Sequence, residues 1–242
     1  MIYRKMPLNK KFYKLFQHNP YISRLNCAFR AVAKSASYAL KVSFVYAVLF
    51  GGAAQAQDRS KEIDVIYSKL VSALPTEGVL MLSPYADSLQ IFGDDIKASY
   101  NKESDAMGGV ALEIETKRGK NPWDAGVFNV AGAEIKKGDV IYMAFFAKAL
   151  ELPKGKESAL IKNVGVQKGT EPYTTVIGKD FSLSQQWQSF ALAGVANDSY
   201  KANEAQLSMQ IATAKQKIAI GPVFVFNLGS DVDPSTLPFI SQ

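Results

Sequence analysis

Two glutamates two positions apart, Glu113 and Glu115, are the residues of this chain whose type and spacing could do chemistry. On a β-strand, residues i and i+2 share a face and lie about 7 Å apart. Two carboxyl groups at such a separation can in principle hydrolyse a glycosidic bond. The chain lacks, however, the longer Glu-x-Asp-x-x-Glu strand motif of jelly-roll hydrolases, and paired glutamates on the wet face of a strand are usually solvated. We expect no enzymatic activity, and a carboxylate-dependent glycoside hydrolase remains an alternative.

Other catalytic chemistries are restricted by composition. The one histidine, His18, and the one cysteine, Cys27, both precede residue 57. Downstream of that point there can be no Ser-His-Asp or Cys-His arrangement and no His-rich zinc site. Any catalysis there would have to depend on carboxylates, Tyr or Lys.

The first 56 residues have the pattern of a secretory leader. They carry nine Lys or Arg and no acidic residue, since Asp58 is the first acid of the chain. An apolar run from Val42 to Phe50 is followed by Gly51-Gly52 and the small-x-small site Ala54-Gln55-Ala56. This order predicts a signal peptide (1–56) cleaved after Ala56 and an exported, periplasmic or extracellular protein. A retained N-terminal anchor is the alternative, although a run of nine residues is short for a bilayer.

Removal of this leader would reverse the sign of the net charge. The full chain carries +6, but residues 57–242 retain 19 Lys and Arg against 22 Asp and Glu, a net charge of −3. The basic balance therefore belongs to the leader. We predict no nucleic-acid partner, and no membrane partner after leader cleavage.

Hydrophobic periodicity predicts one helix followed by many strands. Apolar residues recur at helical spacing from Lys61 to Leu74, with Asp58 or Ser60 as N-cap and Pro75 as the stop. From Gly78 onward the period is two. Strands are expected at 78–82, 109–116, 139–148, around Phe190 and Leu192, at 206–212 and at 217–227, with turns at 137–139, 153–156, 168–170 and 196–198.

The resulting fold class is all-β, an antiparallel sandwich or barrel with a short N-terminal helix. The 186 residues after the leader suffice for one well-buried domain, which needs no disulfide. We predict a helix and lead-in over 57–77, the β domain over 78–228 and an irregular C-terminal tail over 229–242.

Four stretches occur in an order that resembles a known family. They are 117–124 (Lys-Arg-Gly-Lys-Asn-Pro-Trp-Asp), 135–149 with its Lys-Lys-Gly-Asp start, 181–190 with Trp187-Gln188, and the strand pair from Gln206 and Lys217. The succession is similar to carbohydrate-binding modules of families four, nine and twenty-two, as found before family-ten xylanases. This resemblance covers about residues 78–228 and implies a galactose-binding-like jelly-roll sandwich.

The resemblance also implies a site for polysaccharide. In such modules the segment around Trp123 supplies a stacking ring, Arg118 would donate to hydroxyls, and Asn121 and Asp124 flank the ring. Tyr173 matches the place of a second ring. Gln210 lies on the strand where xylan binders often carry Tyr and Glu, so this chain departs from the pattern there. Pyranose rings stack on aromatic faces and their hydroxyls pair with amides, carboxylates and guanidinium groups.

These features together predict non-catalytic binding of xylan or another β-glycan, with a separate glycoside hydrolase as a candidate partner. The other class left open is a protein-interaction or spacer sandwich of a polysaccharide-degrading system. No cofactor is predicted. A structural calcium, common in the resembling modules, would have to use Glu77, Asp94 or Asp95.

Overall fold

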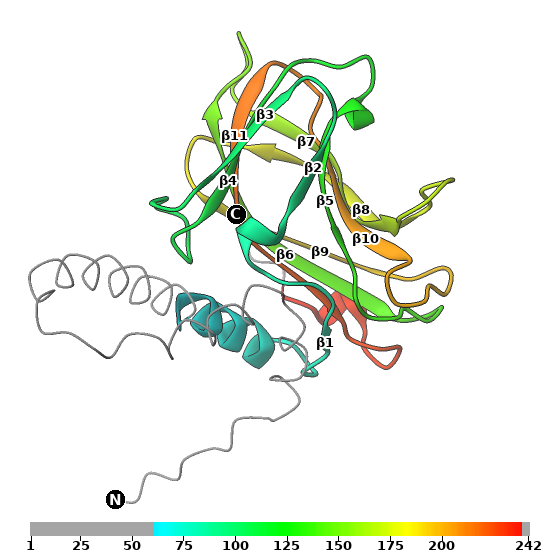
Figure 1. Cartoon of the computed structure of the whole chain (residues 1–242). Coiled ribbons are helices and arrows are strands. Elements are labelled where there is room, and N and C mark those ends of the chain that lie inside the picture. Colours follow the sequence, from blue (N-terminus) through cyan, green and yellow to red (C-terminus); the bar gives the residue numbers. More distant parts are fainter. Residues whose placement is uncertain (1–60, 239–242) are drawn as a thin grey trace, which may run out of the picture. The chain divides into compact units, whose positions relative to one another are not determined.

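The computed structural model describes residues 61–238, which form two antiparallel sheets and one helix (Figure 1). The six-stranded sheet has the order β3-β4-β11-β6-β9, with β1 also paired to β11. Its strands are β1 (Val79–Leu80), β3 (Ile96–Asn101), β4 (Ala111–Thr116), β6 (Val140–Glu151), β9 (Gln188–Val195) and β11 (Gln216–Asn227). Every pairing in it is antiparallel.

The five-stranded sheet has the order β2-β5-β10-β7-β8 and is also antiparallel throughout. Its strands are β2 (Gln90–Phe92), β5 (Gly126–Val130), β7 (Ala159–Lys168), β8 (Thr175–Leu183) and β10 (Ala205–Gln210). Three short 3-10 turns connect strands or follow them: η2 (Ala86–Ser88), η3 (Pro122–Asp124) and η4 (Pro234–Thr236).

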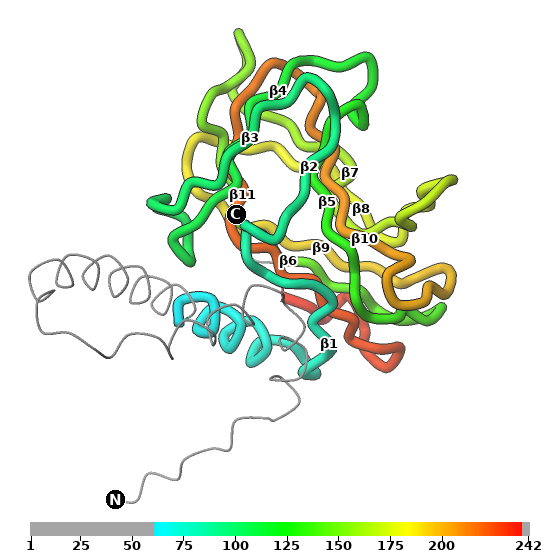
Figure 2. The backbone as a smooth tube through the Cα atoms, in the orientation of Figure 1, coloured from blue at the N-terminus to red at the C-terminus, as the bar shows by residue number. Residues whose placement is uncertain are grey.

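The chain passes repeatedly from one sheet to the other, as Figure 2 traces. From β4 to β11 successive strands change sheet at every step except β7 to β8. This is jelly-roll connectivity, so the predicted antiparallel sandwich with a short N-terminal helix is confirmed. The predicted leader (1–56), its cleavage point after Ala56 and the proposed N-caps Asp58 and Ser60 lie outside the described residues.

The main core fills the space between the two sheets. Inward-facing side chains alternate with outward-facing ones along β4 and β10, as the period of two predicts. Phe145 and Phe190 of the six-stranded sheet stack with centroids 5.0 Å apart, and Phe181 of β8 meets each of them edge-on at 5.2 Å. Such edge-on pairs add directional stability to the burial of the rings.

A second apolar layer covers the outer face of the six-stranded sheet. Strand β6 is apolar on both faces because Tyr142 and Phe146 point away from the main core into this layer. The helix, which covers residues 61–73, packs Ile63 and Leu70 there, and Leu74 follows directly after its end. Each such side chain contributes about 1.5–3 kcal/mol when fully buried.

The C-terminal segment also packs on this face. Leu237 is buried in the same layer, and the Tyr142 hydroxyl donates to the Pro238 carbonyl oxygen at 2.9 Å. Burial raises the pKa of Tyr142 to about 12. The outer face of this sheet is therefore largely occupied by the chain's own residues.

Among residues 61–238, no helix has the length and apolar character needed to span a membrane.

Candidate functional site

The outer face of the five-stranded sheet carries an open groove of about 640 Å³. Its lining comes from all strands of that sheet except β8, and from two loops. The residues are Phe92, Trp123, Phe128, Asn163, Gln167, Gly169, Tyr173, Gln206, Ser208 and Gln210. Figure 1 shows the η3 turn and the β7–β8 loop projecting on the same side of this sheet. These two segments bring Trp123 and Tyr173 to the groove.

Four aromatic rings supply the apolar part of the lining. The indole of Trp123 is 58% exposed and the ring of Tyr173 is 50% exposed, so both offer a face to solvent. Phe92 and Phe128 lie beside one another, with centroids 6.2 Å apart and ring planes at 59°. Large apolar side chains left open in a concave surface are typical of a ligand site.

The register of the sheet explains why the surface is hollow. Ser208 of β10 lies opposite Phe128 of β5 on one side and Gly165 of β7 on the other, and Gly165 faces Gly178 of β8. The row that crosses the strands from Phe128 therefore continues through Ser208, Gly165 and Gly178, which are all small residues. Neither glycine has room for a side chain, since a Cβ on Gly165 would lie 2.0 Å from the Ile177 carbonyl oxygen. The row of small residues forms a floor bounded by larger neighbours.

The polar side chains of the groove are all uncharged. Gln206 and Gln210 flank Ser208 on the outward face of β10, and Asn163 and Gln167 come from β7. Amide side chains both donate and accept hydrogen bonds, so they can pair with hydroxyl groups in either sense. Among the described residues that line the groove, none carries a charge.

Local hydrogen bonds hold the Trp123 turn in place. The Asp124 carboxylate accepts from the Asn121 backbone N–H at 2.9 Å and from its side-chain Nδ2 at 3.4 Å, a reciprocal cap on η3. The Asn121 backbone N–H in particular lowers the pKa of Asp124. Two backbone bonds, Ala212 N–H to the Pro122 oxygen and Ile211 N–H to the Ala125 oxygen, tie the turn to the end of β10.

The structure therefore gathers three of the six predicted site residues. Trp123, Tyr173 and Gln210 line one groove, although they are far apart in the sequence. Asn121 and Asp124 support the Trp123 turn and do not line the groove, and Arg118 is exposed outside the lining.

Sequence reasoning missed six polar or aromatic groove residues, which are Phe92, Phe128, Asn163, Gln167, Gln206 and Ser208. The alternation of β10 placed Gln206 and Ser208 on the face of Gln210, and that signal was sufficient to find them. The other four lie on strands that the hydrophobic pattern did not single out.

The two glutamates of possible catalytic interest lie on the other sheet. Glu113 is on β4, where its carboxylate accepts from Asn101 Nδ2 at 2.8 Å and pairs with Lys217 Nζ at 3.0 Å. The bond from Asn101, and then the pairing with Lys217, lowers the pKa of Glu113. Glu115 pairs with Lys97 at 3.5 Å. A general acid needs a raised pKa, so the environment of Glu113 opposes that role.

The second tryptophan lies in the loop between β8 and β9 and packs against the outer face of the six-stranded sheet. Trp187 is partly buried against the outer apolar layer, and its Nε1 donates to Asp105 Oδ1 at 2.8 Å. The same carboxylate pairs with Lys148, whose Nζ lies 4.9 Å from the centre of the indole ring. The Asp105 carboxylate, the Lys148 ammonium group and the Trp187 ring thus contact one another. These contacts indicate a structural role in packing for Trp187.

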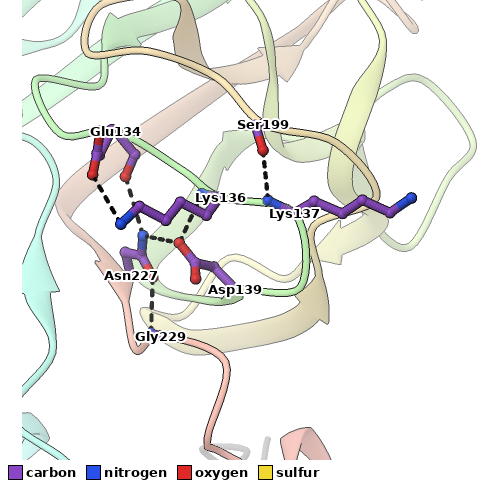
Figure 3. Close-up of polar contacts among 7 residues, drawn as sticks. All are labelled: Glu134, Lys136, Lys137, Asp139, Ser199, Asn227 and Gly229. Atoms are coloured by element: carbon purple, nitrogen blue, oxygen red, sulfur yellow. Dashed lines mark hydrogen bonds and ion pairs between the residues drawn. The ribbon is translucent and has the colours of Figure 1, made fainter.

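The Lys-Lys-Gly-Asp segment is a structural turn, as Figure 3 shows. The buried Asp139 carboxylate accepts from the Lys136 N–H at 2.8 Å and from Asn227 Nδ2 at 2.7 Å. The Asn227 side chain in turn accepts from the Gly229 N–H, and the Lys137 N–H donates to Ser199 Oγ. The segment thus joins the start of β6 to the end of β11, remote from the groove lining.

The residues considered from the sequence as ligands of a structural calcium, Glu77, Asp94 and Asp95, lie in the described part of the chain. No three Asp, Glu, His or Cys side chains within residues 61–238 converge as a set that could hold a metal ion. Asp95, one of the expected ligands, is paired with Lys117 Nζ at 2.7 Å.

Searches against known proteins gave likenesses in structure. No family model and no curated protein matches the sequence. Among solved structures, the chain is similar to the second N-terminal cellulose-binding domain of Cellulomonas fimi β-1,4-glucanase C, with 18% identity and a TM-score of 0.46 over 63% of this chain and 97% of that one. It is also similar to the CBM22-1 xylan-binding domain of Paenibacillus barcinonensis Xyn10C, with 14% identity and a TM-score of 0.44 over 63% and 96%.

A third likeness is to an arabinose-bound α-L-arabinofuranosidase, MgGH51, with 14% identity and a TM-score of 0.48. The aligned part is 61% of this chain but spans only 26% of the arabinofuranosidase. Identities of 14–18% are too low to transfer a function. What the groove binds has to be inferred from its own side chains.

Proposed function

We propose that this protein binds an uncharged β-linked polysaccharide, such as xylan or another β-glycan, without cleaving it. The observation that carries this proposal is one open groove in which four aromatic rings and five uncharged polar side chains converge. A pyranose ring has C–H patches that stack on aromatic faces and hydroxyls that suit amide groups. Other chemistries of ligand fit less well, since a charged polymer would find no countercharge in the lining.

The binding mechanism assigns separate tasks to the two kinds of side chain. Trp123 and Tyr173 provide stacking faces at the two loops, while Gln206, Gln210 and Gln167 offer hydrogen bonds to hydroxyls between them. The shallow floor around Ser208 lets a chain of sugars lie along the surface. Because individual sugar contacts are weak and association has an entropic cost, we expect modest affinity.

The cellular setting is part of the same proposal. The leader pattern of residues 1–56 supports an exported protein, periplasmic or extracellular. There it would hold a polysaccharide for a separate glycoside hydrolase. Glu113 and Glu115 lie on the other sheet, away from the groove, and each is paired with a lysine. This supports binding without catalysis.

Affinity electrophoresis tests the proposal directly. The full chain, or its form after leader removal, is run through native gels that contain soluble xylan, mixed-linkage β-glucan or the acidic polymer polygalacturonate. We expect retardation by at least one neutral polymer and none by polygalacturonate, with no release of reducing ends. Migration unchanged by all neutral polymers would refute the proposed function. Reducing ends released by the wild type and lost in Glu113→Gln would establish the hydrolase alternative.

A further inference from the structure

Strand β7 contains an irregularity beneath the groove. Its register with β8 shifts between Ile161 and Val164, and Asn163 at that point has a φ of 44°. This is the left-handed region, which Asn tolerates better than most residues. The Asn163 backbone N–H donates to Asp180 Oδ1 of β8 at 3.0 Å. A bulge of this kind re-aims a side chain, and here it delivers the Asn163 amide to the groove lining.

The Asn163 amide makes one hydrogen bond and one close packing contact. Its Nδ2 donates to Gln167 Oε1 at 3.4 Å. Its Oδ1 lies over Gly178 of β8, where an added Cβ would be only 2.6 Å away. The side chain thus occupies the space that a larger residue at position 178 would need.

The hydrogen bond from Asn163 affects which atom of the Gln167 amide is available to a ligand. This side chain is only 8% exposed, yet it lines the groove. A glutamine amide has an acceptor oxygen and a donor nitrogen. Because Asn163 engages the oxygen of Gln167, the nitrogen Nε2 is left to face a ligand. We infer that Asn163 is a positioning residue that fixes the polarity of the Gln167 amide, so that the groove offers an N–H donor to an oxygen acceptor of the bound sugar. This inference rests on the proposed function.

The test uses the polymer that retards the wild type most, soluble xylan or mixed-linkage β-glucan, and compares dissociation constants. Asn163→Gly removes the amide while keeping the backbone conformation that Asn163 adopts. We expect Asn163→Gly and Gln167→Ala each to weaken binding about three- to tenfold, as for loss of one neutral hydrogen bond. In the double variant, Asn163→Gly should add nothing to Gln167→Ala, since its effect passes through that amide.

Two further variants separate polarity from packing. Asn163→Asp has the same shape but only accepts hydrogen bonds, so Gln167 should turn its Nε2 inward and present Oε1 to the ligand. Binding should then fall below that of Asn163→Gly. Gly178→Ala, on the neighbouring strand, should displace Asn163 and weaken binding to a similar degree as Asn163→Gly. Thermal unfolding of each variant shows whether the fold is retained, and comparisons are made among variants that retain it.

Three results would overturn the inference. The first is wild-type affinity in Asn163→Gly, and the second is additive losses in the Asn163→Gly/Gln167→Ala double variant. The third is equal affinity of Asn163→Asp and wild type for the chosen polymer. In each of these cases the wild type still binds, so the proposed function stands. A wild type that binds no neutral polymer would refute both.

Discussion

Replacing Trp123 by alanine removes the most exposed aromatic face of the groove. The side chain is 58% exposed at the end of a turn that backbone bonds fix to β10, so the loss should leave the fold intact. One stacked pyranose would remove about 60 Å² of apolar surface from water, worth about 1.5 kcal/mol at roughly 25 cal/mol per Å². Directional ring contacts add about 0.5–1 kcal/mol. A total of about 2 kcal/mol corresponds to roughly a thirtyfold loss of affinity.

Titration calorimetry with a soluble oligosaccharide of the retarding polymer measures this loss. Trp187→Phe is the matched control, because Trp187 is the other tryptophan of the chain and packs against the outer face of the six-stranded sheet, outside the groove lining. It should change stability through its lost bond to Asp105 and leave the dissociation constant unaltered. Trp123→Phe should fall between wild type and Trp123→Ala. If Trp123→Ala binds within twofold of the wild type, stacking at the η3 turn is not the basis of recognition.

Two further predictions concern the six-stranded sheet. Leu70→Ala should lower the free energy of unfolding by about 2–3 kcal/mol, since Leu70 is buried in the outer apolar layer, whereas Val65→Ala on the exposed side of the same helix should change it by less than about 0.5 kcal/mol. Urea unfolding measures both, and equal effects would contradict the packing described. Glu113→Gln should leave polysaccharide binding unchanged and lower stability by about 1 kcal/mol or less near pH 7. Because the folded pKa of Glu113 is lowered, its contribution is complete above the unfolded value of about 4.3 and disappears as the pH falls through the folded value. A stability difference between wild type and Glu113→Gln that stays constant from pH 7 to pH 3 would refute this assignment.

The strands that sequence periodicity predicts are those with one face in the main core. Strands β4, β10 and β11 each bury alternate residues between the sheets, and the central strand β6 is apolar on both faces because a helix covers its outer side. In such positions burial imposes a clear pattern on the sequence. The helix over 61–73 was predicted for the same reason, since its buried face recurs at helical spacing.

Most of the strands that were not singled out lie at sheet edges. Strands β2, β3 and β8 each end a sheet, and β2 and β3 are exposed along most of their length. Little burial leaves little periodicity to detect. Strand β7 is central, but the bulge at Asn163 shifts its alternation partway along the strand. This also explains why Phe92, Asn163 and Gln167 escaped notice as groove residues.

Only part of the candidate site was accessible to local reasoning. Trp123 stands out in the sequence because it lies in an Asn-Pro-Trp-Asp turn, and the structure shows that Asn121 and Asp124 cap this turn. The same chemistry, however, occupies the polar groups of Asn121 and Asp124 in supporting the turn. A ring that is held rigidly by its neighbours is a better stacking surface than a mobile one, because less conformational entropy is lost on binding. In the structure, Asn121 and Asp124 therefore support the turn and do not line the groove.

The two outer faces of the sandwich differ in what covers them, and this difference is why we propose binding on one sheet. On the six-stranded sheet, the helix and the C-terminal segment cover large side chains such as Tyr142 and Phe226, so that face is filled by the chain itself. On the five-stranded sheet, β10 and β7 present small and amide side chains, and the aromatic rings come from β2, β5 and two loops. An extended sugar chain needs a shallow floor with raised aromatic faces. Within residues 61–238 the outer face of the five-stranded sheet meets that requirement, and changes to the helix should therefore act on stability without altering ligand affinity.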